Sequence, residues 1–395
     1  MPKTALLHIG TPKTGTTSIQ RWLAHSQQHG SLAPVRYPLW KGTPHQQRLV
    51  TLYERYEDLP PTMRRIYGPN DKNYRRLREE YREFIYAQLR AATAAVISAE
   101  SLSDVFSPRL AARLRADLES LGFREFRVVL YIRDPADFFL SATQQGLKSD
   151  PADFFLSATQ LGPKTTTRPP FVREPASFKY DFLQMTETWE HAFPGSLVVR
   201  KYPTGFHSDV IDDFSAVLKQ CLRVAPPRVS LRANATLSAE GMQILQDYRV
   251  CGGNLTPDTA RVASFLSESA QLLPQTKPVL RKDVAEQIRA NHRADAEVLH
   301  SRYGVDLGLQ HCGPASTLPR DKPHRVDEIV ESVDPEIVHQ LLLLLVQHVL
   351  SSPPAKRSLA YRAAGSAYRK IHPDYRPERL VGWLRSHLLG GHSPG

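Results

Sequence analysis

One glycine-bounded loop constrains this chain more than any other stretch. Residues 5–9 form a mostly apolar run that predicts a short buried strand, and from Thr16 onward apolar residues recur at helical spacing. Between these segments, Gly10 and Gly15 allow a tight turn and a close approach of the backbone to a ligand. The free N–H groups at the start of a helix and the helix dipole favour an anion there. The sequence therefore predicts a strand, a phosphate-binding loop and a helix in direct succession.

The position of the lysine distinguishes this loop from other phosphate loops. A nucleoside-triphosphatase loop reads G-x-x-x-x-G-K-[ST], with the lysine directly after the second glycine. Here Lys13 lies inside the loop, and Gly15 is followed by Thr16 and Thr17. This spacing argues against a site for ATP and magnesium, and no metal is expected. A plain strand-to-helix turn that binds nothing is the structural alternative.

The loop at residues 12–17, P-K-T-G-T-T, closely resembles the P-K-[ST]-G-T-T loop of the sulfotransferases that use 3′-phosphoadenosine 5′-phosphosulfate. In that family the loop grips the 5′-phosphosulfate without a metal. The resemblance therefore implies a catalytic role for Lys13 and a co-substrate-binding role for the whole loop: Pro12, Lys13, Thr14, Gly15, Thr16 and Thr17. The alternation of predicted strands and helices favours an α/β fold, in which a mostly parallel, P-loop-like sheet is flanked by helices in three layers.

A second motif follows the strand predicted at residues 126–132. The triplet Arg133-Asp134-Pro135 comes directly after it, and position 141 is a serine. In the sulfotransferases a strand likewise ends in an arginine with a serine eight residues beyond, so the resemblance implies that Arg133 and Ser141 bind the 3′-phosphate. A planar guanidinium can bind a phosphate bidentately, and this phosphate distinguishes the co-substrate from ATP. The structural alternative pairs Arg133 with Asp134 or Asp137.

Two residues are candidates for the general base. Glu100 follows the small apolar strand predicted at residues 94–98, and in a parallel sheet the carboxyl ends of the strands share one ligand crevice. Tyrosyl-protein and heparan-type sulfotransferases often use a glutamate as base, and this resemblance makes Glu100 the first candidate. A surface charge or a charge at a helix N-terminus is the alternative. His45, in the loop-rich segment 31–70, is the second candidate for the base or for a contact with the acceptor.

Two weaker expectations concern the nucleotide. Tyr202 ends the strand predicted at residues 196–202, where some sulfotransferases place an aromatic residue against adenine, and core packing is the alternative. Arg232 precedes a helix capped by Ser238 and is expected to add positive charge near the 3′-phosphate.

A tandem duplication interrupts the chain after the second motif. Residues 134–148 recur at 150–164 with identity at 13 of 15 positions. The second copy carries Ser149 where Arg133 precedes the first, so Ser157 is not expected to bind the co-substrate. The duplication lies close to the expected acceptor side of the site.

Length and charge suggest three regions. We expect an α/β domain over residues 1–310, a polar linker over 311–334 and a helical, basic C-terminal extension over 335–395. The net charge is +11, and residues 355–395 carry +6 of it. Such a tail can contact nucleic acid, an acidic glycan or an anionic membrane, or it is simply a solvated helix face. Of these, peripheral membrane contact is retained as an expectation and nucleic acid is not favoured.

The sequence thus predicts transfer of a sulfuryl group to a hydroxyl or amine of an unidentified acceptor, with a glycan or a lipid as the classes considered. Two rivals remain: a non-catalytic polyanion- or glycan-binding protein on the same fold, and a P-loop kinase. The longest apolar run, at residues 341–346, is far shorter than the roughly 20 residues of a membrane span. With no recognisable signal peptide, a cytoplasmic location is expected. Three widely spaced cysteines indicate neither a disulfide framework nor a zinc site.

Overall fold

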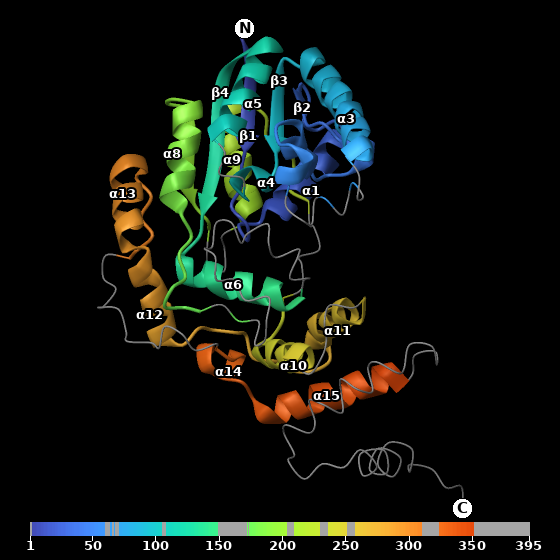
Figure 1. Ribbon diagram of the computed structural model, residues 1–395, viewed down its shortest axis with the longest axis vertical. Helices are drawn as coiled ribbons and strands as arrows, with labels where there is room; N and C mark the ends of the chain where they lie inside the picture. The colour runs from blue at the N-terminus through green and yellow to red at the C-terminus, as the bar shows by residue number, and fades with distance from the viewer. Residues whose placement is uncertain are drawn as a thin grey trace, which may run out of the picture.

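A five-stranded parallel sheet organises the chain. The computed structural model describes residues 2–59, 64, 67, 71–104, 108–148, 172, 174–203, 209–229, 236–250, 257–309 and 324–350. Within them the strands lie in the order β2-β3-β1-β4-β5, and every neighbouring pair is parallel. The strands are β1 (Lys3–His8), β2 (Val35–Arg36), β3 (Ala94–Ser98), β4 (Phe123–Ile132) and β5 (Leu197–Lys201). The expected α/β fold with a parallel sheet is confirmed (Figure 1).

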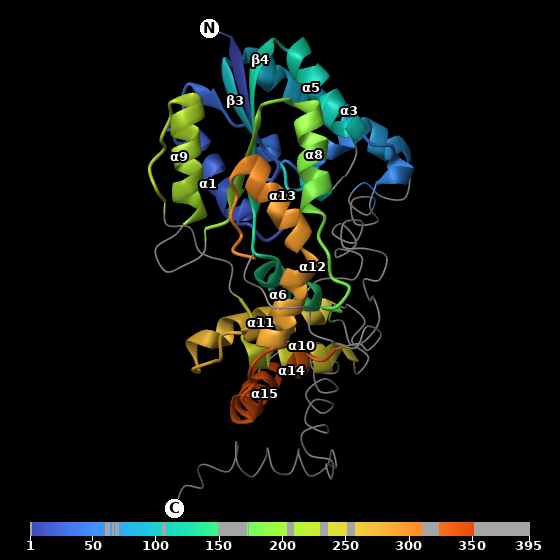
Figure 2. The ribbon, with the colours of Figure 1, turned by 90° about the vertical axis from the view of Figure 1, so that its left-hand side faces the viewer.

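Helices cover both faces of this sheet. Strand residues alternate between the two faces, so Leu6, Val96 and Val129 pack on one side and Leu7, Ile97 and Leu130 on the other. The first face is covered by α1 (Thr16–Gln28) and α9 (Val210–Leu222). The second is covered by α3 (Asp71–Ala91), α5 (Pro108–Ser120) and α8 (Phe182–Ala192). Figure 2 shows the resulting three layers, with the strands between the two helix groups.

The strands end at a common edge, here called the carboxyl edge. Strand β1 lies at the centre, between β3 and β4, with Leu6 in register with Val96 and Arg127. The chain leaves β1 towards β2 and β3 and then crosses to β4 and β5 on the other side. In open parallel sheets, ligands bind where the chain changes sides in this way. The loop after β1 therefore occupies the position at which a binding site is expected.

A second group of helices lies beyond the carboxyl edge. Figure 1 shows α6 (Pro135–Lys148) running across this edge, between the sheet and the later helices. Helices α10 (Ala239–Val250) and α12 (Lys282–Asn291) contact α6, and α15 (Pro335–Leu350) contacts α10 and α11 (Pro257–Glu268). The remaining helices are α4 (Ser101–Asp104), α13 (Arg293–Tyr303) and α14 (Val326–Ile329), and short 3-10 turns lie at Trp40–Gly42, Gln47–Leu52, Tyr56–Asp58 and Ser269–Gln271.

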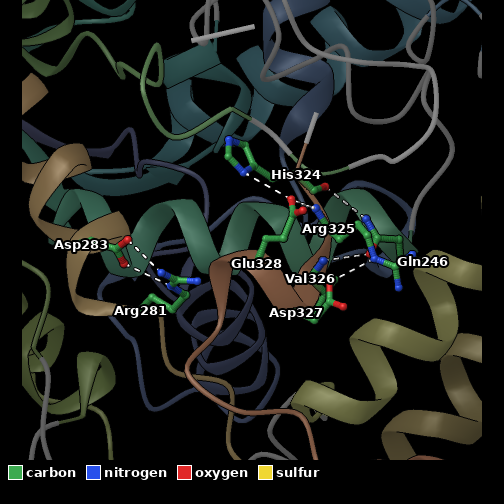
Figure 3. Close-up of polar contacts among 8 residues, drawn as sticks. All are labelled: Gln246, Arg281, Asp283, His324, Arg325, Val326, Asp327 and Glu328. Carbon is green, nitrogen blue, oxygen red and sulfur yellow. Dashed lines mark hydrogen bonds and ion pairs between the residues drawn. The ribbon is translucent and has the colours of Figure 1, made fainter. Parts of the chain in front are cut away.

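Part of the expected linker is packed into this helical group. Val326 and Ile329 of α14 are fully buried, and Val330 forms an antiparallel bridge with Leu280. The Gln246 side chain accepts a hydrogen bond from the Val326 N–H at 2.9 Å, as Figure 3 shows. The three-region division of the chain stays a prediction, because residues 310–323 and 351–395 lie outside the described part. Among the described helices, none is both long and apolar enough to cross a membrane.

The last residue of β1 is a fully buried histidine. The Nδ1 atom of His8 lies 2.8 Å from the Ser98 hydroxyl, and the ring packs against Tyr131 and Phe214. Because burial disfavours the charged imidazolium, the pKa of His8 is lowered to about 3. His8 is therefore neutral in the folded protein near neutral pH.

This burial makes folding stability depend on pH. Between the unfolded pKa of about 6.5 and the folded value, the unfolded chain binds a proton that the folded chain does not, so stability falls as pH falls. We expect His8 to contribute a slope of up to about 1.4 kcal/mol per pH unit in this window. His8→Gln should flatten the curve of unfolding free energy against pH, measured by chemical denaturation between about pH 4.5 and 7. The exposed His29→Gln should leave the slope unchanged, and equal slopes in all three proteins would contradict the account.

Candidate functional site

The loop between β1 and α1 adopts a backbone that requires glycine. Gly10 and Gly15 have φ values of 33° and 73°, in the left-handed region. A Cβ atom on Gly15 would lie 2.7 Å from Val210 Cγ1, and one on Gly10 would lie 2.5 Å from Thr16 Oγ1. Lys13 also has a positive φ, 65°, which costs a residue with a side chain about 1–2 kcal/mol. The loop is thus closely constrained, and α1 begins directly after it at Thr16.

Threonine hydroxyls hold the loop in this shape. Thr11 Oγ1 donates to the Tyr131 carbonyl at 2.7 Å, which joins the loop to β4. Thr14 Oγ1 donates to the Thr11 carbonyl at 2.7 Å, and both side chains are fully buried. The proton of the Thr14 hydroxyl is therefore used within the loop. Pro12 is buried and Thr17 is half-buried on the first turn of α1.

The structure brings Lys13 and Glu100 together at the carboxyl edge. Both residues are half-buried, and the Thr16 hydroxyl, which donates to the Thr11 carbonyl at 3.5 Å, also interacts with the Glu100 carboxyl group. Burial raises the pKa of Glu100 above its usual range, although the Lys13 charge and the Thr16 hydrogen bond oppose this shift. Burial lowers the pKa of Lys13, with Glu100 opposing the shift and Arg133 adding to it. Glu100 thus lies beside the loop at the carboxyl edge, and its role as a base stays a prediction.

Arg133 connects the second motif to the loop. Its Nη1 donates to the Lys13 carbonyl at 3.1 Å, and its guanidinium lies 5.3 Å from the centre of the Tyr202 ring. The Arg133 Nε atom is buried without a hydrogen-bond partner in the described part of the chain. An arginine in this position retains donors for a ligand.

The alternative pairing of Arg133 with Asp134 is not formed. Asp134 accepts from the N–H groups of Ala136 and Asp137 at 2.9 and 3.1 Å, so it caps α6, and it forms an ion pair with Arg289 at 3.0 Å. Among the described residues, Asp137 makes no ion pair with Arg133 either, although burial raises the pKa of Asp137 and the charge of Arg133 opposes the rise.

Of the other residues predicted to bind the nucleotide, the structure places Tyr202 beside Arg133 and Ser141 on α6, and it does not describe Arg232. Tyr202 is half-buried beneath the Arg133 guanidinium, and its backbone N–H donates to the Ile132 carbonyl at 2.7 Å. Ser141 is half-buried on the second turn of α6, and its hydroxyl makes no hydrogen bond to any residue that the structure describes. Arg232 and the second copy of the duplication, residues 150–164, lie outside the described residues.

His45 lies near the carboxyl end of β3, to which it is linked by Gln20 of α1. Its Nδ1 is 2.6 Å from Gln20 Oε1, and Gln20 Nε2 donates to the Ser98 carbonyl at 2.8 Å. The neighbouring Gln46 accepts from the Ser98 N–H at 3.0 Å. Burial, and secondarily Arg21, lowers the pKa of His45. His45 is therefore at the same edge as Glu100, but its ring is bonded to Gln20.

Two residues near the loop, Gln145 and Lys148 at the end of α6, belong to neither sequence motif. Lys13 Nζ donates to Gln145 Oε1 at 3.2 Å, and Lys148 lies one turn further along the helix. Burial, and secondarily the charge of Lys13, lowers the pKa of Lys148 to about 8. The sequence after Arg133 predicts a helix that contains both residues. No local sequence pattern indicates that the end of this helix contacts the loop of residues 10–15.

Taken together, the site is suited to an anion with two charged groups. The N-terminus of α1, Lys13 and Arg133 meet at the carboxyl edge, and Glu100 supplies one carboxylate beside them. Within the described residues, no cluster of three or more histidine, cysteine or acidic side chains is placed to hold a metal ion.

Comparison with known proteins leaves this chain without a family assignment. No protein-family model matches it, and no curated protein matches it in sequence. Among solved structures, the chain is similar to a sulfotransferase from Alicyclobacillus acidocaldarius, with 16% identity and a TM-score of 0.34. The similarity covers 67% of this chain and 96% of that one. A match at this level assigns no activity to this chain.

The glycine requirement of the loop predicts a specific stability difference. Gly15→Ala places a non-glycine residue in the left-handed region and also brings its Cβ atom against Val210. Gly30→Ala has only the backbone strain, because Gly30 has φ 72° and an added Cβ atom would have nothing within 4 Å. We expect Gly30→Ala to cost about 1–2 kcal/mol and Gly15→Ala clearly more. Denaturant unfolding of both variants measures the difference. Equal losses would show that the loop relaxes away from Val210.

Proposed function

We propose that this chain transfers a sulfuryl group from 3′-phosphoadenosine 5′-phosphosulfate to a hydroxyl or amine acceptor. The observation that carries the proposal is the hydrogen bond from Arg133 Nη1 to the Lys13 carbonyl, 3.1 Å long. It holds the Arg133 guanidinium, whose Nε–H has no partner among the described residues, beside the phosphate-type loop. The guanidinium and the positively polarised N-terminus of α1 suit a nucleotide with anionic groups at both its 3′ and 5′ positions.

The residues at the carboxyl edge fit such a ligand. The left-handed glycines and the N-terminus of α1 supply backbone N–H groups for the 5′ end. The buried Nε of Arg133, which has no partner among the described residues, is a donor for the 3′-phosphate. The Tyr202 ring under Arg133 offers a flat surface beside the same end. Ser141, and Arg232 beyond the described residues, remain proposed contacts of the 3′-phosphate.

The roles of the remaining side chains follow from their environments. When bound, the co-substrate supplies an electrophilic sulfuryl group. Glu100 accepts the acceptor proton on its carboxylate, and its raised pKa makes it a stronger base than an exposed glutamate. The Thr16 hydroxyl orients this carboxylate. Lys13 stabilises negative charge that develops on the leaving oxygen. His45, held by Gln20, is the second candidate for the base or for a contact with the acceptor.

The two rivals make different use of the same features. A kinase would use ATP, which lacks the 3′-phosphate for which Arg133 is proposed. A non-catalytic polyanion-binding protein would depend on the basic tail and not on Lys13 and Arg133. The acceptor, with a glycan or a lipid as the classes considered, and any membrane contact of the tail stay proposals.

Calorimetric titration with 3′-phosphoadenosine 5′-phosphate tests the proposal without knowledge of the acceptor. We expect this nucleotide to bind more tightly than ADP, and we expect Arg133→Ala to remove about 1.5–3 kcal/mol of that preference, since a charge-assisted hydrogen bond is lost. Arg55→Ala, at an exposed arginine paired with Asp58, is the matched control and should change nothing. Equal affinity of the wild type for both nucleotides would contradict the proposal. Binding of sulfated polyanion that survives both Lys13→Ala and Arg133→Ala would favour the binding-protein rival.

The base role of Glu100 predicts a pH dependence. A base acts only when deprotonated, so turnover should fall as pH falls through the Glu100 pKa, and this limb should lie above the pKa of an ordinary glutamate, 4.5. Glu100→Gln should remove the limb and lower kcat about 10²–10⁴-fold while nucleotide binding is retained. Release of 3′-phosphoadenosine 5′-phosphate in the presence of a panel of hydroxyl and amine compounds measures turnover. Unchanged turnover of Glu100→Gln together with loss in His45→Gln would move the role to His45.

A further inference from the structure

A buried glutamine connects α1 to the segment that contains His45. Gln20 lies on the second turn of α1, and its side chain is 2% exposed. Its Oε1 atom is 2.6 Å from His45 Nδ1, and its Nε2 atom is 2.8 Å from the Ser98 carbonyl oxygen. The two ends of this amide therefore have different partners, one on each side.

The contact with Ser98 determines which way the Gln20 amide is turned. A carbonyl oxygen accepts hydrogen bonds and cannot donate them, so the NH₂ group of Gln20 must face Ser98. The amide oxygen of Gln20 then faces His45, and this oxygen can also only accept. The His45 ring must therefore donate, which requires a proton on Nδ1.

Ser98, which orients the amide, is itself firmly held. It is fully buried at the end of β3, in register with His8 of β1. Its N–H donates to Gln46 Oε1 at 3.0 Å, and its hydroxyl lies 2.8 Å from His8 Nδ1. The Gln46 amide is oriented in turn, because its Nε2 donates to the Pro38 carbonyl at 2.8 Å. The proton on His45 Nδ1 thus follows from a chain of contacts that ends in the central sheet.

The second nitrogen of the His45 ring is left as an acceptor. Burial, and secondarily the charge of Arg21, lowers the pKa of His45, so the ring is neutral near neutral pH. In a neutral imidazole one nitrogen carries the proton and the other has a free lone pair. With the proton on Nδ1, that lone pair is on Nε2. His45 is half-buried, and its Nε2 makes no hydrogen bond to any residue in the described part of the chain.

Helix α1 brings His45 close to Glu100. Thr16 and Gln20 are four residues apart, so they lie on the same face of α1 with their Cβ atoms about 5–6 Å apart. The Thr16 hydroxyl interacts with the Glu100 carboxyl group, and Gln20 contacts His45. The strand gives the same placement, because Glu100 follows Ser98 by two residues. His45 and Glu100 are therefore neighbours at the carboxyl edge, about one helical turn apart.

We propose that Gln20 is a positioning residue that holds the His45 ring with its proton on Nδ1, so that Nε2 accepts a hydrogen bond from the acceptor substrate. This inference rests on the proposed function. Glu100 takes the proton of the reacting hydroxyl or amine, and His45 Nε2 receives a second hydrogen of the same molecule. The acceptor that fits both groups carries another N–H or O–H hydrogen at or next to the reacting atom.

NMR measures the position of the proton on His45 without nucleotide or acceptor. The chemical shifts of the two ring nitrogens in isotope-labelled protein distinguish a nitrogen with a proton from one without. We expect the proton on Nδ1 in the wild type, with the signals assigned by their loss in His45→Ala. Gln20→Leu should populate both tautomers, whereas Gln28→Leu, at an exposed residue of the same helix, should match the wild type. A proton on Nε2 in the wild type near neutral pH would overturn the inference.

A double-mutant cycle tests whether Gln20 acts through His45. With an acceptor that has a second donor, Gln20→Leu and His45→Ala should each lower kcat/KM for the acceptor about two- to tenfold, the effect of one neutral hydrogen bond. The double variant should lose no more than either single variant. Additive losses would show that Gln20 acts elsewhere, for example on Ser98, and would overturn its role. A loss of the same size with an acceptor that lacks the second donor would overturn the contact of Nε2.

These outcomes are distinguishable from failure of the proposed function. A wild type that binds 3′-phosphoadenosine 5′-phosphate no more tightly than ADP refutes the proposed function, whatever the tautomer of His45. A wild type that shows this preference, with the proton on Nε2 or with additive losses, refutes only the role of Gln20. Gln20→Leu leaves the buried Ser98 carbonyl without its side-chain donor, and if this variant folds poorly the tautomer of the wild type still decides the inference.

Discussion

The hydrogen bond from the Arg133 guanidinium to the Lys13 carbonyl joins two loops that follow adjacent strands of the sheet. The loop after β1 has little freedom, because its glycines are left-handed and packed against Val210 and Thr16. The Arg133 end of β4 is equally fixed, since Asp134 caps α6 and is bonded to Arg289 of α12. One hydrogen bond between two rigid segments therefore sets the distance between the loop and the guanidinium. The proposed selection of a 3′-phosphorylated nucleotide depends on this distance.

Partial burial governs the chemistry of the charged groups around this bond. Glu100, Lys13 and Lys148 all lose hydration, and burial moves each pKa towards the neutral form. Lys13 and Glu100 offset this loss for each other, because their charges are opposite. Lys148 has the opposite relation to Lys13, because both side chains carry a positive charge.

The sequence allowed prediction of the parts of the site that local patterns encode. The glycine spacing and the apolar run before it predicted the loop between β1 and α1, and the rule for carboxyl ends of parallel strands predicted that Glu100 would lie beside it. Contacts between distant segments could not be predicted in this way. Lys13 and Gln145 are 132 residues apart, and only the packing of α6 against α10 and α12 brings the end of this helix to the loop. The two-residue strand β2 and the buried α14 are too short to leave a periodic signal.

A crystal structure with bound 3′-phosphoadenosine 5′-phosphate tests the central claim most directly. The account predicts the 5′-phosphate in the loop of residues 10–17, within hydrogen-bond distance of Lys13 and the first N–H groups of α1, and the 3′-phosphate on Arg133. A nucleotide bound elsewhere, or bound with its 3′-phosphate in solvent while Arg133 keeps only its bond to the Lys13 carbonyl, would contradict it.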